Sequence, residues 1–203
     1  MDIKRVLITA GPTWVSIDKV RVLSNIATGE TGILLAERLQ RLGAKVTLLL
    51  GSAGLCCINK KIKLLRFNFF NELKDKITKE LKTKKYDIVI HAAAVSDYRP
   101  AKIFKGKIRS GINRLKIGLV PTLKIIGLIK KIDPLVFLVG FKFEPGANRE
   151  KLIKETRGLI RQANLDLAVA NSIAFFRAIS NKKLQWFCTP KLANDQFVEN
   201  GNF

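Results

Sequence analysis

The chain has 203 residues, 47% of them hydrophobic, which is enough to bury a substantial core and predicts one domain over residues 1–203. Its 37 lysines and arginines outnumber 16 acidic residues and give a formal net charge of +21 at pH 7, which favours phosphate-bearing ligands. No apolar run approaches the ~20 residues of a transmembrane helix. No signal peptide precedes the first expected strand, so the expected location is the cytoplasm.

Metal-ligating and nucleophilic side chains are scarce. Cys56, Cys57 and Cys188 lack the spacing of a zinc site and indicate reduced structural thiols. His91 is the only histidine and lies inside an apolar run, which favours a packed or edge-of-site residue over a catalytic base. The sequence therefore predicts neither a protein-ligated metal nor serine–histidine catalysis.

The basic residues are spread over expected helix faces, as in Lys74–Lys85, without interleaved aromatic residues. A solvated, lysine-rich surface accounts for most of this charge, and attraction of phosphate-bearing substrates is the functional interpretation. A basic nucleic-acid-binding module remains an alternative, and it predicts binding with a steep salt dependence.

The first half of the chain alternates expected strands and helices. Val6–Thr9 is a β-rich run that ends in a turn at Ala10-Gly11-Pro12-Thr13, after which a long ordered loop begins at Trp14. A helix is predicted over Gly29–Leu42, stopped by Gly43, and a buried strand over Val46–Leu50.

The pattern continues after a poorly patterned connection at residues 52–63, which we expect to be mobile or variable. Leu73, Ile77 and Leu81 recur at helical spacing and predict a helix with a lysine-rich outer face. A strand at Asp87–Ala94 follows. This order of strands and helices predicts a parallel sheet with right-handed crossovers.

The second half begins with a basic, glycine-containing flap at Lys102–Arg109. The further expected elements are a strand at Leu115–Val120, a helix at Thr122–Ile132 with Pro121 in its first turn, a strand at Leu135–Phe141, a helix at Arg149–Ala163, and strands at Leu167–Ala170 and Leu184–Cys188. The tail from about residue 190 is predicted to be flexible. The predicted fold is a Rossmann-like, three-layer α/β fold with a mostly parallel central sheet.

Polar residues collect where the expected central strand ends, in Ser96-Asp97-Tyr98-Arg99-Pro100. Ligands of open α/β sheets bind at this carboxyl edge. Thr28 and Gly29 place free backbone N–H groups at the start of a helix, suited to a phosphate, although ordinary helix capping explains Thr28 equally well. The GxGxxG of dinucleotide-binding folds is absent, which counts against the alternative of an NAD(P)-dependent oxidoreductase.

Several motifs, in a fixed order, resemble those of the phosphopantothenate–cysteine ligases, the ligase domain of the DNA/pantothenate metabolism flavoprotein family. VLITAGPT, IDKVRVLSN and ATGETG are similar to the family's opening strand, its ID-VR-ISN segment and its S-[ST]-G-x-x-G turn. HAAAVSDYRP, KIRS, VPTLKII, LVGFK and LDLAVAN resemble its AAVSDY segment, basic flap, TPKII helix start, VGFK strand and DLIVAN strand. The resemblance covers about residues 5–172.

The resemblance implies a nucleotide-dependent ligase of coenzyme A biosynthesis. The carboxylate of 4′-phosphopantothenate would attack the α-phosphate of CTP or ATP, with Mg²⁺, and release pyrophosphate. The amine of cysteine would then attack the acyl-nucleotide and give 4′-phosphopantothenoylcysteine. Such chemistry needs charge stabilisation more than a protein nucleophile. The resemblance also implies a homodimer in which one subunit helps to complete the site of the other.

Residue roles follow where positions match the family motifs. Asn25 would lie against the activated acyl group, and Lys107 of the flap would engage the triphosphate. Asp97 would accept hydrogen bonds from the base or ribose. The function therefore requires Asn25, Asp97 and Lys107 to converge around one activated phosphate. The remaining implied nucleotide contacts are Gly11, Thr13, His91, Ala92, Ala93, Pro121, Thr122, Leu123, Lys124, Phe141, Arg157 and Arg161, and the implied substrate contacts are Arg21, Thr28 and Gly29 with Asn25.

The sequence departs from the family pattern at Val15, Glu30, Thr122 and Ser172. Glu30 brings a negative charge near the expected anion site. The flavin-binding decarboxylase domain often found ahead of this ligase is not recognisable in the chain. No FMN is therefore expected, and a separate phosphopantothenoylcysteine decarboxylase is the implied functional partner. The residues do not distinguish CTP from ATP.

Overall fold

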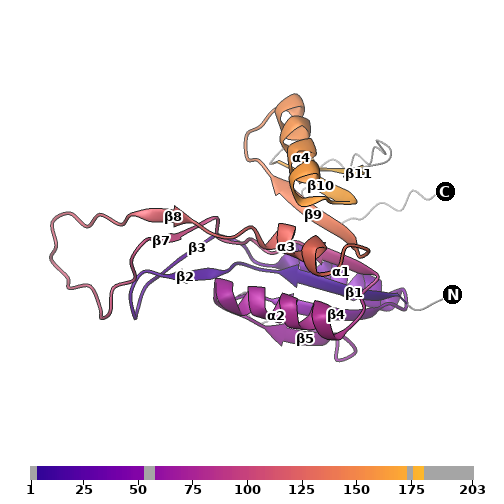
Figure 1. The fold of residues 1–203 in the computed structure, drawn as a ribbon, viewed down its shortest axis with the longest axis horizontal. Coiled ribbons are helices and arrows are strands. Elements are labelled where there is room, and N and C mark those ends of the chain that lie inside the picture. Colours follow the sequence, from indigo (N-terminus) through magenta and orange to yellow (C-terminus); the bar gives the residue numbers. More distant parts are fainter. Residues whose placement is uncertain (1–3, 53–57, 173–175, 181–203) are drawn as a thin grey trace, which may run out of the picture. The chain divides into compact units, whose positions relative to one another are not determined.

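The computed structural model describes residues 4–52, 58–172 and 176–180. The chain divides into two compact units, Met1–Leu138 and Val139–Phe203, which are described in turn (Figure 1). Within the described residues, no helix is long and apolar enough to cross a lipid bilayer.

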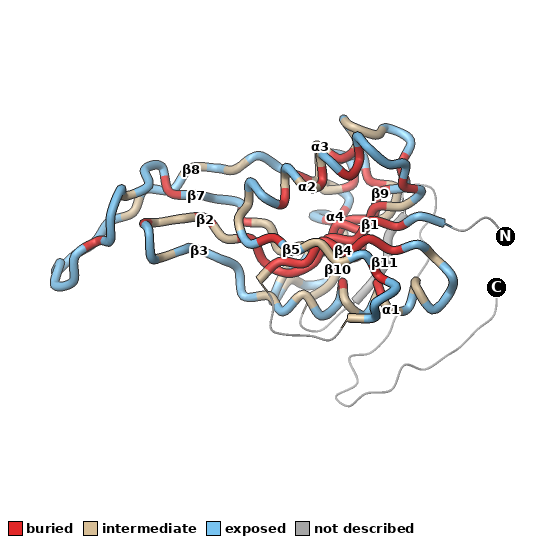
Figure 2. Tube along the Cα trace, turned by 90° about the horizontal axis from the view of Figure 1, so that it is seen from below, coloured by how far each residue is buried: buried red, intermediate tan, exposed pale blue. Residues whose placement is uncertain are grey.

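A parallel sheet forms the centre of the first unit, with the strand order β6 (Ile88–His91), β1 (Arg5–Ala10), β4 (Lys45–Leu50) and β5 (Lys63–Arg66). Thr9 of β1 lies opposite His91 of β6 on one side and Leu49 of β4 on the other. After their first residues, β1 and β4 are buried without interruption, as expected for strands covered on both faces (Figure 2). All their carboxyl ends therefore meet at one edge.

Three helices belong to this unit: α1 (Glu30–Arg41), α2 (Phe70–Thr83) and α3 (Ile125–Ile132). Helix α1 packs on β1 and β4, while α2 and α3 pack on each other. The predicted apolar stripe of α2 is confirmed, since Leu73, Ile77 and Leu81 are all buried. Gly43 ends α1 with a positive φ of 90°, as predicted for a helix stop.

Two antiparallel ribbons extend from the sheet of the first unit (Figure 1). One pairs β2 (Trp14–Ser16) with β3 (Val22–Ser24), and the other pairs β7 (Tyr98–Pro100) with β8 (Leu119–Pro121). Strands β2 and β7 lie in contact. We call these ribbons and their connecting segments, residues 14–24 and 98–121, the arm. Most of the arm is exposed or only half-buried (Figure 2).

The second unit pairs β9 (Phe137–Phe143), which begins two residues before it, with β10 (Leu167–Asn171) in parallel. β10 pairs in turn with β11 (Phe176–Ser180) in antiparallel fashion. Helix α4 (Arg149–Ala163) packs on β10 and begins at the N-cap Asn148, whose side chain accepts a hydrogen bond from the backbone N–H of Lys151 at 2.9 Å.

The predicted α/β fold with mostly parallel strands is confirmed, but several elements differ. The helix expected from Thr122 starts only at Ile125, because Pro121 belongs to β8 and Thr122 bonds backward to the 96–97 segment. The strand expected at Leu115–Val120 is reduced to Leu119–Pro121. Strands β2, β3, β5, β7 and β11 were not predicted. The strand expected at Leu184–Cys188, the tail and the three cysteines lie outside the described residues.

Candidate active site

Three glycine backbones meet at the carboxyl edge of the first unit's sheet. Gly11 and Gly29 have φ of 78° and 77°. A Cβ on Gly29 would lie 3.1 Å from the backbone nitrogen of Gly11, and a Cβ on Gly11 would lie 3.1 Å from that of Gly51. One on Gly51 would lie 2.4 Å from the carbonyl oxygen of Pro12. Only glycine permits this approach, which brings the start of α1 against the ends of β1 and β4.

Hydrogen bonds join the turn after β1 to the segment after β6. The backbone N–H of Ala94 donates to the carbonyl of Gly11 at 2.9 Å, and that of Thr13 donates to Ala94 at 3.2 Å. The fully buried Thr13 hydroxyl accepts from the backbone N–H of Ser96 at 2.9 Å. Thr13 therefore works as a buried clamp between two loops, and this explains its place in the motif without any ligand contact.

Asn25 lies against the same segment. It follows β3, is exposed, and its Nδ2 donates to the carbonyls of Ala94 at 3.1 Å and Val95 at 3.2 Å. The neighbouring Ser24 hydroxyl donates to the carbonyl of Thr13 at 3.2 Å. With both amide hydrogens directed to backbone carbonyls, Oδ1 of Asn25 is left as a hydrogen-bond acceptor at the sheet edge.

Asp97 continues from this segment and carries an exposed carboxylate. Its Oδ1 accepts from the ammonium of Lys124 at 2.6 Å, and both side chains are more than half exposed, so the pair is loosely held. Thr122 supports Asp97 from the other side, since its hydroxyl donates to the carbonyl of Ser96 at 2.6 Å and its N–H to that of Asp97 at 2.9 Å. Pro121 and Leu123 flank Thr122 and are exposed.

His91 is a core residue. Its Nδ1 lies 2.8 Å from the Thr9 hydroxyl, and burial lowers the pKa of the imidazole to about 4, so the ring is neutral at pH 7. The next residues, Ala92 and Ala93, direct their backbone N–H groups to Thr9 at 3.0 and 3.3 Å. The side chain of His91 therefore holds β1 to β6, and the packed interpretation agrees with the structure.

The flap is anchored by a residue that sequence reasoning missed. Asp18 is 4% exposed, and its carboxylate accepts from the backbone N–H groups of Ile108 at 3.0 Å, Val20 at 2.7 Å and Arg21 at 2.6 Å. The Arg21 guanidinium also binds it and donates to the carbonyl of Ile108 at 3.3 Å. These bonds, that of Ile108 first, hold the pKa of Asp18 far below its ordinary value despite burial. The D-x-x-R spacing inside IDKVR was the available signal.

Lys107 precedes Ile108 and is therefore fixed beside the turn that joins β2 to β3. Further backbone bonds tie the flap to the same turn, from Phe104 to Ile17 at 3.0 Å and from Lys19 to Gly106 at 3.4 Å. Asn25 and Asp97 share the sheet edge at the opposite end of that hairpin. Asn25 thus lies beside the segment that leads to Asp97, whereas Lys107 is held on the arm, and the convergence of all three around one phosphate stays a prediction.

The other predicted residues are dispersed. Arg21 is engaged in the arm, where its NH1 group binds Asp18, and its contact with a substrate stays a prediction. Thr28 precedes the N-cap Gly29 of α1, and its hydroxyl accepts a hydrogen bond from the N–H of Glu30 at 3.3 Å. Phe141, Arg157 and Arg161 belong to the second unit, where Phe141 is half-buried in β9 and the two arginines are exposed on α4. Their contact with the nucleotide stays a prediction.

A divalent metal has no cage among the described residues, because no cluster of three histidine, cysteine or acidic side chains is found there. The exposed carboxylate of Asp97 is the acidic group at the sheet edge described above. This donor set suits Mg²⁺, which prefers phosphate oxygens and water to an all-protein site.

Comparisons with known proteins agree with this geometry. The family model described as DNA/pantothenate metabolism flavoprotein C-terminal domain matches residues 1–189. A coenzyme A biosynthesis bifunctional protein, CoaBC, from Thermococcus kodakarensis is 41% identical over 180 residues, which are 88% of this chain and 44% of that protein. The chain thus spans less than half the length of this curated relative.

Two solved structures share the fold. A DNA/pantothenate metabolism flavoprotein from Streptococcus pneumoniae superposes with a TM-score of 0.81 at 25% identity, covering 92% of this chain and 93% of that one. The C-terminal domain of a CoaBC protein superposes with a TM-score of 0.77 at 26% identity, covering 94% and 87%. The chain belongs to the family of DNA/pantothenate metabolism flavoprotein C-terminal domains.

Proposed function

We propose that this chain is a nucleotide-dependent ligase that joins 4′-phosphopantothenate to cysteine in coenzyme A biosynthesis. The proposal depends mainly on one observation at the sheet edge. The side chain of Asn25 donates hydrogen bonds to the carbonyls of Ala94 and Val95, and Asp97 follows two residues later. Asn25 and Asp97 belong to two motifs and lie 72 positions apart in the sequence. Membership of the family and the name of the Thermococcus kodakarensis relative support the same pathway.

The proposed reaction has two steps, formation of the acyl-nucleotide and attack of the cysteine amine on it. Different residues of this edge act in each step. Asp97 accepts hydrogen bonds from the nucleotide's base or ribose, and Lys124 beside it contributes a positive charge near the phosphates. The close approach of the Gly11, Gly29 and Gly51 backbones brings the start of α1 to this edge, where its N–H groups favour an anion. Mg²⁺, when bound with the triphosphate, neutralises charge on the leaving pyrophosphate.

Asn25 acts in the second half-reaction. Because its Nδ2 is engaged by two backbone carbonyls, its Oδ1 is the atom available to a substrate. An amide oxygen orients the N–H groups of an incoming amine without adding a charge. We assign this oxygen to the amine of cysteine as it attacks the acyl-nucleotide. Asn25 could instead donate a hydrogen bond to the acyl oxygen only if Nδ2 gave up its bonds to the backbone carbonyls of Ala94 and Val95.

Lys107 reaches a triphosphate in one of two ways: the flap moves, or the lysine serves the site of a second copy. We favour a homodimer because the arm exposes many large apolar side chains, which monomers seldom present together. Val20, Tyr98, Ile103, Ile112 and Leu119 are each between 49% and 65% exposed. We propose that this second copy brings its Lys107 to its partner's sheet edge.

The decisive assay incubates the protein with Mg²⁺, 4′-phosphopantothenate, cysteine, and either CTP or ATP, and measures pyrophosphate and the amide product. The expected result is one pyrophosphate per amide with one nucleotide strongly preferred. Omission of 4′-phosphopantothenate is the control and should abolish pyrophosphate release. Folded protein that forms no product with either nucleotide would overturn the proposal.

A further inference from the structure

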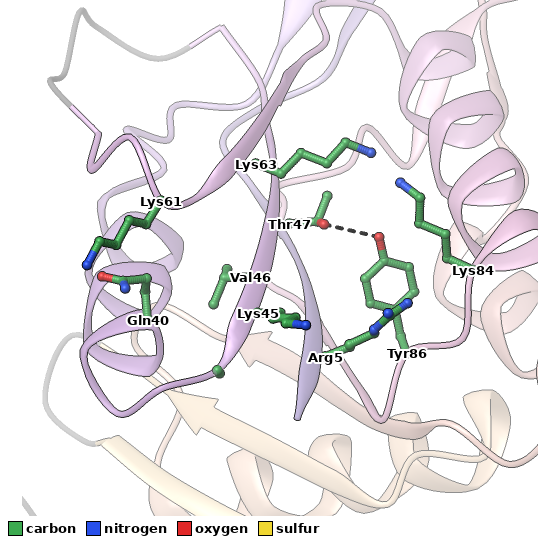
Figure 3. Close-up of a pocket in the computed structure, with 10 residues that line it drawn as sticks. Arg5, Gln40, Lys45, Val46, Thr47, Lys61, Lys63, Lys84 and Tyr86 are labelled. Atoms are coloured by element: carbon green, nitrogen blue, oxygen red, sulfur yellow. Dashed lines mark hydrogen bonds between the residues drawn. The ribbon is translucent and has the colours of Figure 1, made fainter. Parts of the chain in front are cut away.

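The first unit has a basic pocket at the edge of its sheet opposite the candidate active site (Figure 3). It has a volume of about 380 Å³ and is lined where β1, β4 and β5 begin and just before β6. The strands are parallel, so the pocket and the site are separated by roughly the length of a six-residue strand, about 17 Å. The proposed ligase chemistry uses none of the residues that line it.

Five cationic side chains line this basic pocket, and none of its lining residues is acidic. The cations are Arg5, Lys45, Lys61, Lys63 and Lys84. The volume falls in the range of small-molecule sites and is too small for a polymer. The charge and the size together point to a compact anion rather than to nucleic acid.

Two of the five cations, Lys63 and Lys84, already share a buried acidic partner. Glu80 is buried, and its carboxylate accepts from Lys63 at 2.7 Å, from Lys84 at 3.0 Å and from the Tyr86 hydroxyl. Burial alone would raise the pKa of Glu80, but these hydrogen bonds outweigh it and lower the pKa to about 2. Glu80 therefore stays ionised and holds the two lysines and Tyr86 in place at neutral pH.

The same network fixes the aromatic wall. Tyr86 is buried, lies 3.1 Å from the Thr47 hydroxyl, and has its pKa raised to about 12, first by burial and then by Glu80. Figure 3 shows Lys63 and Lys84 reaching toward the hydroxyl end of this ring, with Arg5 and Lys45 nearer the start of the strands. Hydrogen bonds therefore hold this side of the pocket, formed by Tyr86, Lys63 and Lys84, in a fixed arrangement.

The remaining cations are less compensated. Asp87 lies near Arg5, accepts its backbone N–H at 2.7 Å and pairs with Lys4 at 3.7 Å, so it offsets part of the Arg5 charge. Within the described part of the chain, no acidic partner is found for the ammonium groups of Lys45 and Lys61. Both residues are exposed. An anion entering the pocket would supply the missing countercharge.

We propose that this basic pocket is a second binding site, separate from the active site, for a small molecule with two or more phosphate groups. Lys45 and Lys61 supply the charge that recognises the ligand, Arg5 adds a planar donor, and the Glu80 network holds the wall. A ligand there would contact the first residues of β1 and β4, whose last residues position the active-site glycines.

The test is an NMR titration of the full chain with inorganic tripolyphosphate, without nucleotide, following backbone amides of Lys45, Thr47 and Tyr86. These amides should shift saturably. The double variant Lys45→Gln/Lys61→Gln should weaken binding at least tenfold, a change of about 1.4 kcal/mol. The matched control, Lys79→Gln/Lys82→Gln, removes equal charge from exposed positions of α2 that do not line the pocket and should stay within about twofold.

A third variant separates this pocket from the active site. Lys107→Gln should leave the titration of the pocket amides unchanged, even if it weakens shifts at residues 94–97. The proposal fails if the pocket amides do not shift. It also fails if both double variants lose affinity equally, because general charge would then explain binding, or if Lys107→Gln abolishes the shifts at Lys45 and Tyr86.

Discussion

At the scale of single residues, Asn25 is the side chain on which the proposed second half-reaction depends. Its oxygen is free at the sheet edge while its nitrogen is bound to the backbone. Asn25→Ala should lower amide formation by about a hundredfold, the loss typical of one oriented polar group in an active site. Nucleotide affinity should change little. Rapid-quench measurement of the acyl-nucleotide should show that it accumulates.

Ser24→Ala is the matched control, because Ser24 is the adjacent residue and its hydroxyl bonds only backbone carbonyls. It should retain amide formation within a few-fold of the unaltered protein. An Asn25→Ala protein that lost nucleotide binding and amide formation equally would contradict the role assigned to the amide oxygen.

The buried side chain of His91 predicts that the stability of the protein depends on pH. The buried imidazole has a pKa of about 4, against an ordinary value of 6.5, so the unfolded chain binds the proton more readily than the folded protein. Stability therefore falls as the pH drops below about 6.5, until the folded pKa is reached. Between pH 6.5 and 5 the free energy of unfolding should decrease by up to about 2 kcal/mol.

Urea unfolding across this range measures the effect, and the chain's single histidine makes the assignment clean. The lowered carboxyl pKa values, such as that of Glu80, act only at lower pH. His91→Gln should be less stable at pH 7 but should show a flat profile from pH 6.5 to 5. The same slope in both proteins would rule out His91 as its source.

At the scale of elements, the flap and the β2–β3 hairpin behave as one piece because Asp18 joins them. Asp18→Asn removes the charge that holds the N–H of Ile108 and the Arg21 guanidinium. Hydrogen exchange of residues 104–108 should speed up by about tenfold or more, as expected when a local closed state is lost. The KM for the nucleotide should rise, because Lys107 is no longer held.

Asp75→Asn serves as the control, since Asp75 is an exposed α2 carboxylate that meets only Lys74, at 3.5 Å, among the described ion pairs. It should change neither exchange nor KM. Unchanged protection at Ile108 in the Asp18→Asn protein would show that the backbone bonds from Phe104 and Lys19 suffice to hold the flap.

The elements also show why some features were predictable. Periodicity identified α2, whose apolar residues recur at helical spacing, and short apolar runs identified β1 and β4, which the structure shows to be buried after their first residues. The flap of the arm was predicted, but β2, β3 and β7 were not, because these strands are three residues long and partly exposed, so neither alternation nor a long apolar run marks them. β5 was hidden for the same reason, being a four-residue edge strand in a lysine-rich stretch.

The candidate site was predictable in part. The motif spacing brought Asn25 and Asp97 to one edge, since each follows an element that ends there. It did not locate Lys107, because the position of a flap depends on tertiary bonds to Asp18 rather than on local sequence. The start of α3 was also misjudged, since Thr122 prefers two bonds to the 96–97 backbone over capping a helix.

At the scale of the whole molecule, the question is whether Lys107 serves its own site or that of a second copy. Asn25→Ala and Lys107→Gln proteins, each inactive alone, can be mixed after mild dissociation. If the site is shared between subunits, each mixed dimer has one intact site, and an equal mixture should recover about a quarter of full activity. Steady-state rates, with sedimentation to verify dimers, measure this.

The control mixture pairs Asn25→Ala with a second portion of Asn25→Ala protein treated in the same way, and it should recover nothing. Mixed dimers that form but stay inactive would show that Lys107 acts within its own subunit, by movement of the flap. A chain that sediments only as a monomer would contradict the shared site altogether.

The contact between Gly11, Gly29 and Gly51 has a consequence for engineering. A Cβ on Gly11 or Gly51 would press on main-chain atoms, and one on Gly29 would meet both the Gly11 main chain and the Leu50 side chain. Substitution is therefore expected to be strained at Gly11 and Gly29, whose φ is positive, and to clash with the Pro12 carbonyl at Gly51. Any library aimed at a different nucleotide should keep these glycines fixed and vary the exposed residues around Asp97 and Leu123 instead.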